Sequence, residues 1–203
     1  MYDSAITAED FVASVASTVN IGCSLPEEFY LDVLSRLEQL LYSEHIREER
    51  LLFADAIDGE IDLSQAIVPE GERIPRADDV FAVYFGDRPL RRIRLSEAYL
   101  LEPEPGQESF YKSDDAKISL CLSEEAEEDD IAVFYHAAPR LKVGEGKSDR
   151  VALPFEFLSL AEAKLRGEAY KLADDDASAA KWLSEYNALL SSFATWAKGR
   201  GAV

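Results

Sequence analysis

The sequence predicts an α+β protein in which two pairs of helices form a four-helix bundle-like core, with a small antiparallel β unit inserted between the pairs. Apolar residues recur at helical spacing near both ends of the chain. In the middle, prolines and glycines recur too often for long helices, and short runs between them are rich in β-branched and aromatic residues. We therefore expect an N-terminal helix pair within residues 1–66, the β insertion within 67–152 and a C-terminal helix pair within 153–203.

The first helix is expected to begin at Thr7, whose hydroxyl can accept a hydrogen bond from a free backbone N–H, with Asp10 as its capping-box partner. Gly22 is expected to end this helix. Pro26 suits the first turn of a second helix, because the N–H that proline lacks would be unsatisfied there. The apolar stripe of the second helix predicts that it runs to about Glu49.

The inserted segment contains two predicted strand pairs. Residues 80–85 and 90–95 flank a turn at 86–89, which predicts a hairpin. Residues 117–122 and 131–136 form the second expected pair. The connector between these last two strands is acidic and is expected to be a solvated loop. Its glutamates are Glu124, Glu125, Glu127 and Glu128.

Leu153 and Pro154 are expected to open the third helix, and the acidic run 174–176 is expected to end it and cap the fourth. In the fourth helix, apolar and aromatic residues follow one another at spacings of 4, 3, 4 and 3, which places them on one helix face. We expect this seam to be helical core: Trp182, Tyr186, Leu189, Phe193 and Trp196.

The chain has 203 residues, and its 40 acidic and 21 basic residues give a formal net charge of −19. This charge argues against direct binding of nucleic acid through a basic surface, because phosphate contacts need lysine and arginine. It fits mutual repulsion of free subunits, and also acidic walls past which DNA slides. No apolar run is long enough to span a bilayer. Cys23 and Cys121 are expected to be reduced thiols of an intracellular protein.

The sequence contains no pattern typical of a catalytic, metal or cofactor site. His45 and His136 lack a nearby Cys or His at metal-ligand spacing, and neither a nucleophile elbow nor a phosphate-binding glycine motif opens a helix. The acidic runs lack the ligand spacing of a calcium loop. We therefore expect no catalytic residue, no metal and no cofactor.

Arg91, Arg92 and Arg94 belong to the basic stretch of this acidic chain. Two interpretations stay open. The arginines are either solvated positions on a strand or a docking surface for the acidic connector of a neighbouring copy, since patches of opposite sign favour association.

The layout resembles the head-to-tail adaptor (connector) proteins of tailed bacteriophages, which bind beneath the portal ring. About 130 residues on the C-terminal side of the chain contribute to the resemblance, and the order of the similar segments matters more than any one of them. The similar segments are residues 74–83, 86–93, 118–122 followed by 131–141, and 153–157 followed by 164–176 and 179–187.

Members of this family form rings, often twelve-fold, that extend the portal channel and receive the tail. The resemblance implies a non-catalytic virion subunit of the head-tail neck, assembled in the host cytoplasm. Its partners would be copies of itself, the portal protein and a downstream tail or nozzle protein. Double-stranded DNA would pass without specific binding, and no membrane would be involved. The family tends to have a longer C-terminal extension that grips the portal, so the mode of attachment stays open.

The main alternative is a small acidic regulator or inhibitor that acts by DNA mimicry or by binding a host protein. Such a protein would present carboxylates along one rigid surface and would be a monomer or dimer in solution. Another tail-completion subunit and an enzyme without a recognisable motif are the remaining alternatives.

Overall fold

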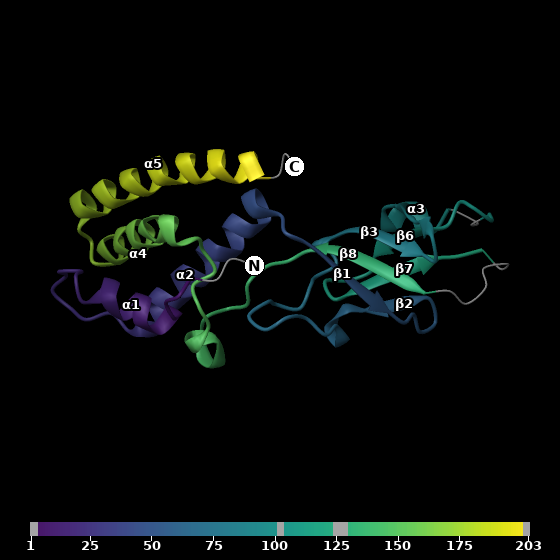
Figure 1. The fold of residues 1–203 in the computed structure, drawn as a ribbon, viewed down its shortest axis with the longest axis horizontal. Coiled ribbons are helices and arrows are strands. Elements are labelled where there is room, and N and C mark those ends of the chain that lie inside the picture. Colours follow the sequence, from purple (N-terminus) through teal and green to yellow (C-terminus); the bar gives the residue numbers. More distant parts are fainter. Residues whose placement is uncertain (1–3, 101–103, 124–129, 201–203) are drawn as a thin grey trace. The chain divides into compact units, whose positions relative to one another are not determined.

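The computed structural model describes residues 4–100, 104–123 and 130–200 and has the predicted mixed α+β architecture, a helical core with an inserted β unit. The chain forms two compact units (Figure 1). The helical unit combines residues 1–47 with 138–203, and the β unit comprises residues 48–137.

The β unit begins and ends earlier in the sequence than the expected 67–152. Strands β1 (Glu49–Ala54) and β2 (Glu60–Asp62) lie in the segment assigned to the N-terminal helices. The segment after residue 137 belongs to the helical unit because α2 binds its backbone: Lys142 N donates to Ser35 Oγ at 2.7 Å, and Ala152 N donates to Glu38 Oε1 at 2.7 Å.

Helix α1 spans Ala8–Ala16, and the Thr7 hydroxyl caps it by accepting from Asp10 N, as predicted. The helix ends six residues before Gly22. The hydroxyls of Ser17 and Thr18 donate to the carbonyls of Ser14 and Val15, at 2.7 Å each. Hydroxyl groups that bind nearby carbonyls offer the backbone an alternative to further helix, and the sequence stripe alone does not reveal this competition.

Helix α2 spans Glu27–Leu41 and continues into one π-helical turn, Tyr42–Ile46. It ends before the expected Glu49 because Arg47 adopts a left-handed conformation, with φ of +46°. A non-glycine residue in this region stops helical hydrogen bonding and redirects the chain.

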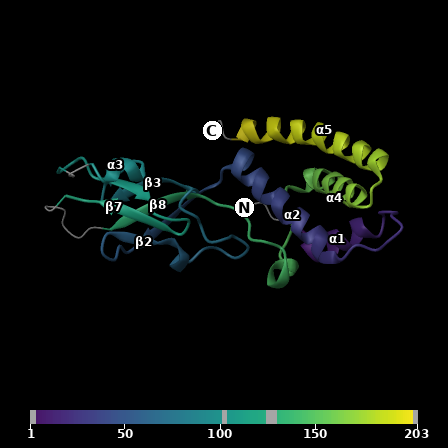
Figure 2. The ribbon, with the colours of Figure 1, turned by 180° about the vertical axis from the view of Figure 1, so that it is seen from behind.

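Helices α4 (Leu158–Leu172) and α5 (Asp176–Arg200) lie side by side in both views (Figures 1 and 2). A 3-10 turn, Phe155–Phe157, precedes α4. Asp175 begins the last helix as predicted, because its carboxylate accepts from Ser178 N at 3.1 Å.

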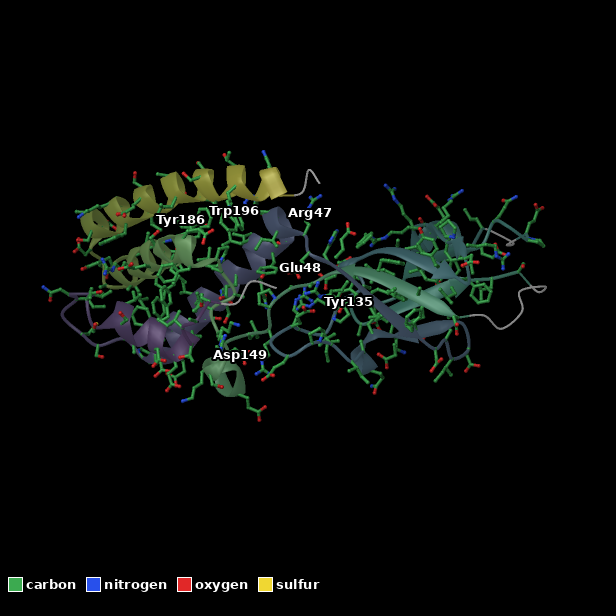
Figure 3. The ribbon with its side chains drawn as sticks, viewed as in Figure 1. Arg47, Glu48, Tyr135, Asp149, Tyr186 and Trp196 are labelled. Atoms are coloured by element: carbon green, nitrogen blue, oxygen red, sulfur yellow. The ribbon has the colours of Figure 1, made fainter. Side chains whose placement is uncertain are left out.

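The predicted aromatic seam of α5 lies in the core of the helical unit. Tyr186 and Phe193 are buried, and Trp182, Leu189 and Trp196 are partly buried against them. Figure 3 shows Tyr186 and Trp196 extending from α5 toward the rest of the helical unit. The core residues from α1 and α2 join the same cluster, so both helix pairs form one core, as the sequence predicts.

Gly167 allows α4 and α5 to approach closely, and this contact gives a testable prediction. A Cβ at Gly167 would lie 2.7 Å from Leu183 Cδ2, whereas a Cβ at Gly199 in α5 would meet nothing within 4 Å. We expect Gly167→Ala to destabilise the helical unit by about 1 kcal/mol because the overpacking outweighs the gain in helix propensity. Gly199→Ala is the matched control and should be neutral or slightly stabilising. Urea unfolding monitored by circular dichroism measures both; equal stabilisation by the two changes would contradict a close contact.

The β unit contains two four-stranded sheets around one core. The first sheet has the order β1-β8-β3-β4 and the second β2-β7-β6-β5. Buried residues of both sheets, such as Val83 and Val133 of the first and Ile61 and Ile118 of the second, belong to one apolar cluster. The remaining elements are β3 (Val80–Phe85), β4 (Arg88–Pro89), β5 (Arg91–Arg92), the short helix α3 (Leu95–Ala98), β6 (Ser109–Lys112), β7 (Lys117–Cys121) and β8 (Ile131–His136).

The second predicted strand pair is wrong in its pairing. β7 and β8 exist close to their predicted bounds, but they lie in different sheets: β8 pairs with β1 and β3, and β7 with β2 and β6. The first predicted pair is also wrong in its second strand: β3 forms a hairpin with β4, whose residues 88–89 lie in the predicted turn, and not with residues 90–95. Beyond Pro89 the chain crosses to the second sheet, where β5 pairs in parallel with β6.

A tight turn explains why strands appear before residue 67. Asp58 and Gly59 both have positive φ, +52° and +76°, and the flanking Ile57 and Glu60 exchange backbone hydrogen bonds of 2.9 Å. Two-residue hairpin turns of this kind favour an Asp-Gly pair. Within the described part of the chain, no helix is long and apolar enough to span a bilayer.

Candidate interaction surface

The outer face of the first sheet is apolar and aromatic. Side chains alternate along β8, so that Val133 and Tyr135 enter the core while Phe134 and His136 point to the other face. The same alternation exposes residues of β1 and β3. We call this surface the aromatic face; it consists of Leu51, Phe53, Phe81, Tyr84, Phe134 and His136.

Ring contacts connect most of the aromatic face. The Phe134 ring centroid lies 5.3 Å from that of Tyr84 and 6.2 Å from that of Phe81, and Phe81 stacks on His136 at 4.6 Å. Phe53 is nevertheless 73% exposed and Leu51 47%. Contiguous apolar surfaces of this kind are typical of protein interaction sites, and aromatic side chains dominate the energy of many interfaces.

The predicted arginines lie in and just after β5, at the edge of the second sheet. Residues 88–94, which we call the arginine strand, follow β3 after the turn at 86–87. Leu90 and Ile93 point into the β unit and are 7% and 6% exposed. Arg91, Arg92 and Arg94 are all exposed, as expected for either solvated positions or a docking surface.

Arg91 and Arg92 contact neighbouring residues of the β unit. Arg91 Nη2 lies 3.7 Å from Glu97 Oε2, and both side chains are largely exposed to solvent. Arg92 Nη1 donates to the carbonyl of Val80 at 2.9 Å, which places it next to the beginning of the aromatic face at Phe81. Exposed ion pairs contribute little to stability, so Arg91 is free to change partners.

The predicted acidic partner of the arginines, Glu124, Glu125, Glu127 and Glu128, lies outside the described residues. The acidic residues as a whole are unevenly divided between the units. The β unit contains 23 acidic and 9 basic residues, so its net charge of −14 accounts for most of the −19 of the chain. Sequence reasoning missed this asymmetry because the unit boundaries were not known.

The histidines and cysteines are not brought together into a site. His45 packs against Phe193, with 6.0 Å between ring centroids, whereas His136 stacks on Phe81 in the β unit. Cys23 is exposed and Cys121 is half-buried, and both are free thiols. Among the described residues, no group of three or more His, Cys, Asp or Glu side chains is arranged to hold a metal ion.

Two buried carboxylates were not predicted. In the β unit, Glu72 Oε1 accepts from Arg50 Nε at 3.1 Å, and burial together with the Glu72 charge raises the pKa of Tyr135. In the helical unit, Glu38 and Lys142 are both buried, with 3.7 Å between Oε2 and Nζ. Both pairs connect segments far apart in the sequence, so no local pattern indicates them.

The aromatic face was also missed, although a sequence signal for it exists. Leu51 and Phe53 alternate with Leu52 and Ala54, which is the spacing of a strand with two apolar faces. Strands with two apolar faces are expected either in a sheet covered on both sides or in a sheet that binds a partner. Here the inner face forms the core and the outer face is open.

No family model matches this chain, and no curated protein matches it. By its fold and surface, the chain is an α+β protein with one helical unit and one acidic β unit. The β unit has an exposed aromatic face and an adjacent arginine strand.

Proposed function

We propose that this chain is a structural head-to-tail adaptor subunit of a tailed bacteriophage. Copies of it would form a ring that extends the portal channel and joins it to the tail. The observation that supports this proposal best is the aromatic face beside the arginine strand, since a single copy leaves both exposed. The resemblance of the sequence to adaptor proteins indicates what kind of assembly would cover them.

The electrostatics of the β unit suit this role. A net charge of −14 on a unit of 90 residues makes free copies repel one another, which favours assembly on a preformed ring over premature association. Acidic walls also let double-stranded DNA pass without retention, because phosphates find no dense basic surface. The role needs no chemical step, and the chain would act as a structural protein and not as an enzyme.

The partners in this proposal are further copies of the chain, the portal protein and a downstream tail or nozzle protein. The location would be the head-tail neck of the virion. The resemblance to the family leads us to expect twelve copies. A head-to-tail contact closes into a ring only when the rotation between neighbours matches the number of copies.

Electron microscopy of the purified chain mixed with its cognate portal ring tests the proposal. We expect the chain alone to be largely monomeric at low salt and the mixture to show an added ring of density beneath the portal. Moderate salt should promote ring formation because it screens the repulsion between acidic units. Portals without added density at every salt concentration would contradict the adaptor role.

A small acidic inhibitor remains the second candidate, favoured by the concentration of charge on the β unit. DNA mimicry would require binding to a basic DNA-binding protein by a monomer or dimer. Analytical ultracentrifugation with the portal and with a basic DNA-binding protein separates the two candidates.

A further inference from the structure

The β unit is closed on one side and open on the other. On the closed side, the arginine strand is hydrogen-bonded to both sheets. Leu90 N donates to the carbonyl of Val83 in β3 at 2.8 Å, and Arg91 N donates to the carbonyl of Glu108, directly before β6, at 3.2 Å. On the opposite side, among the described residues, β1 pairs only with β8 and β2 only with β7. The two sheets therefore end there in two strand edges.

A groove of about 770 Å³ lies at the open side, where the end of β1, the Asp58-Gly59 turn and β2 meet β6 and β7. We call it the acidic groove. Its lining contains four carboxylates, Asp55, Asp58, Glu60 and Asp62, and a single lysine, Lys117. These five charges sum to −3. Lys117 Nζ lies 3.1 Å from Glu60 Oε2, so these two residues already form an ion pair.

Apolar side chains flank these carboxylates. Phe53 and Ile57 line the groove and are 73% and 76% exposed. Soluble proteins usually protect edge strands with proline, inward charges or a covering segment, because an open edge invites association. Strand β1 is six residues long, contains no proline and exposes both Leu51 and Phe53. Such an edge is expected to be covered in the assembled protein.

We propose that the acidic groove receives the arginine strand of a neighbouring copy. This inference rests on the proposed ring and names the contact that would build it. Arg91, Arg92 and Arg94 of one copy would meet Asp55, Asp58 and Asp62 of the next. In this contact the carboxylates that line the groove take the place of Glu124, Glu125, Glu127 and Glu128, which were one of the two interpretations of the sequence.

Charge complementarity supports this occupant over others. The three arginines bring +3 to a lining of −3. The Arg91–Glu97 ion pair is exposed, so little stability is lost when Arg91 turns to a neighbour. Arg92 would exchange its 2.9 Å hydrogen bond to the Val80 carbonyl for one to a carboxylate. Inside a groove that water leaves, an arginine–carboxylate contact is stronger than on an open surface. Arginine also forms two parallel hydrogen bonds to a carboxylate, which fixes its orientation.

The placement of the two surfaces determines the kind of assembly. The arginine strand and the acidic groove lie on opposite sides of one two-sheet unit. A contact between unlike surfaces on opposite sides is heterologous, so copies add head to tail and form a ring when the rotation closes. A two-fold dimer would instead require one self-complementary surface.

Complementary charge reversal tests the contact. The first variant is R91E/R92E/R94E, and the second is D55K/D58N/D62K, in which asparagine keeps the positive φ of position 58. Neither variant alone should form rings with the portal or at moderate salt, because each has two surfaces of the same sign. Mixed in equal amounts, they should form rings with alternating subunits, since each acidic strand then meets a basic groove. Native mass spectrometry and electron microscopy measure ring formation, and circular dichroism shows that each variant is folded.

A crosslinking experiment covers the case in which a variant does not fold. In a C23S/C121S background, Asp55→Cys combined with Arg92→Cys should give a ladder of crosslinked oligomers with a short bis-maleimide under ring-forming conditions. Asp55→Cys combined with Arg76→Cys is the control: Arg76 is also exposed but lies outside the arginine strand, so this pair should give far less crosslinked oligomer. Three results would overturn this contact and leave the adaptor role intact. They are rings that persist in both reversed variants, folded variants that do not assemble when mixed, and crosslinked ladders of equal intensity in the two cysteine pairs. Failure of the unmodified chain to assemble with the portal would overturn both.

Discussion

Replacing Lys142 with methionine is expected to destabilise the helical unit by about 3 kcal/mol at pH 8 and by less than about 1 kcal/mol at pH 5. Lys142 and Glu38 are buried, with exposed side-chain fractions of 1% and 0%. Glu38 Oε1 accepts from Ala152 N, whereas its Oε2 has no hydrogen-bond partner among the described residues. Removing the lysine therefore leaves a buried carboxylate without its counter-charge.

The direction of the pH dependence follows from the pKa of Glu38. Burial raises that pKa to about 7, although the Lys142 charge and the Ala152 N–H both act to lower it. A raised pKa means that the folded state holds a proton that the unfolded state releases between pH 4.5 and pH 7. The stability that this proton contributes is present below pH 4.5 and is lost as the pH rises through 7. Without Lys142 the pKa rises further, so the loss continues to higher pH.

Urea unfolding at pH 5 and pH 8, monitored by circular dichroism, measures the effect. The matched control is E38Q/K142M, which removes both charges but keeps an acceptor for Ala152 N. Its stability should lie within about 1 kcal/mol of the unchanged chain at pH 8 and should vary less with pH. The same destabilisation of K142M at both pH values would show that the carboxylate does not titrate as we infer.

Local patterns in the sequence were sufficient for the presence of the four main helices and for the N-terminal caps of α1 and α5. The Thr7 cap of α1 and the aromatic seam of α5 depend on residues within a few positions of one another, and both are confirmed. The end of α2 was missed because the left-handed conformation of Arg47 has no residue-type signal. Asparagine or glycine at that position would have indicated a helix end, whereas arginine does not.

The strand pairing could not be predicted because it is non-local. β8 pairs with β1, about 80 residues earlier in the chain, and not with β7, the strand before it. The Asp58-Gly59 turn was the available signal for strands before residue 67, since an Asp-Gly pair between apolar residues predicts a hairpin. Recognising it would have moved the unit boundary closer to residue 48.

The candidate site was predicted in part. The exposure of Arg91, Arg92 and Arg94 agrees with both interpretations of the basic stretch. The acidic groove was not predicted, because its carboxylates lie near a segment that was expected to be helical, and Tyr111 and Lys117 complete it from strands over 45 residues away. A groove formed by distant segments becomes visible only once the sheet order is known.

Replacing Phe193 with alanine is expected to destabilise the helical unit by about 4 kcal/mol. Phe193 is fully buried, and its ring contacts rings from three segments. The centroid distances are 5.0 Å to Phe157 before α4, 5.4 Å to Trp196 in α5 and 6.0 Å to His45 at the end of α2. Alanine would remove the contacts that connect these segments and leave a cavity that the surrounding helices cannot fill.

Thr195→Ala is the control on the same helix. Thr195 is exposed, and its hydroxyl donates only to the Ser191 carbonyl of its own helix at 3.0 Å, so its loss should change the stability by less than about 0.5 kcal/mol. Phe193→Leu should fall between the two, because leucine keeps much of the apolar volume. Urea unfolding followed by tryptophan fluorescence is suited to the measurement, since Trp196 packs against the Phe193 ring and reports the local environment. A cost below about 1 kcal/mol for Phe193→Ala would mean that the seam can collapse around the missing ring and that α5 is held mainly by its contacts with α4.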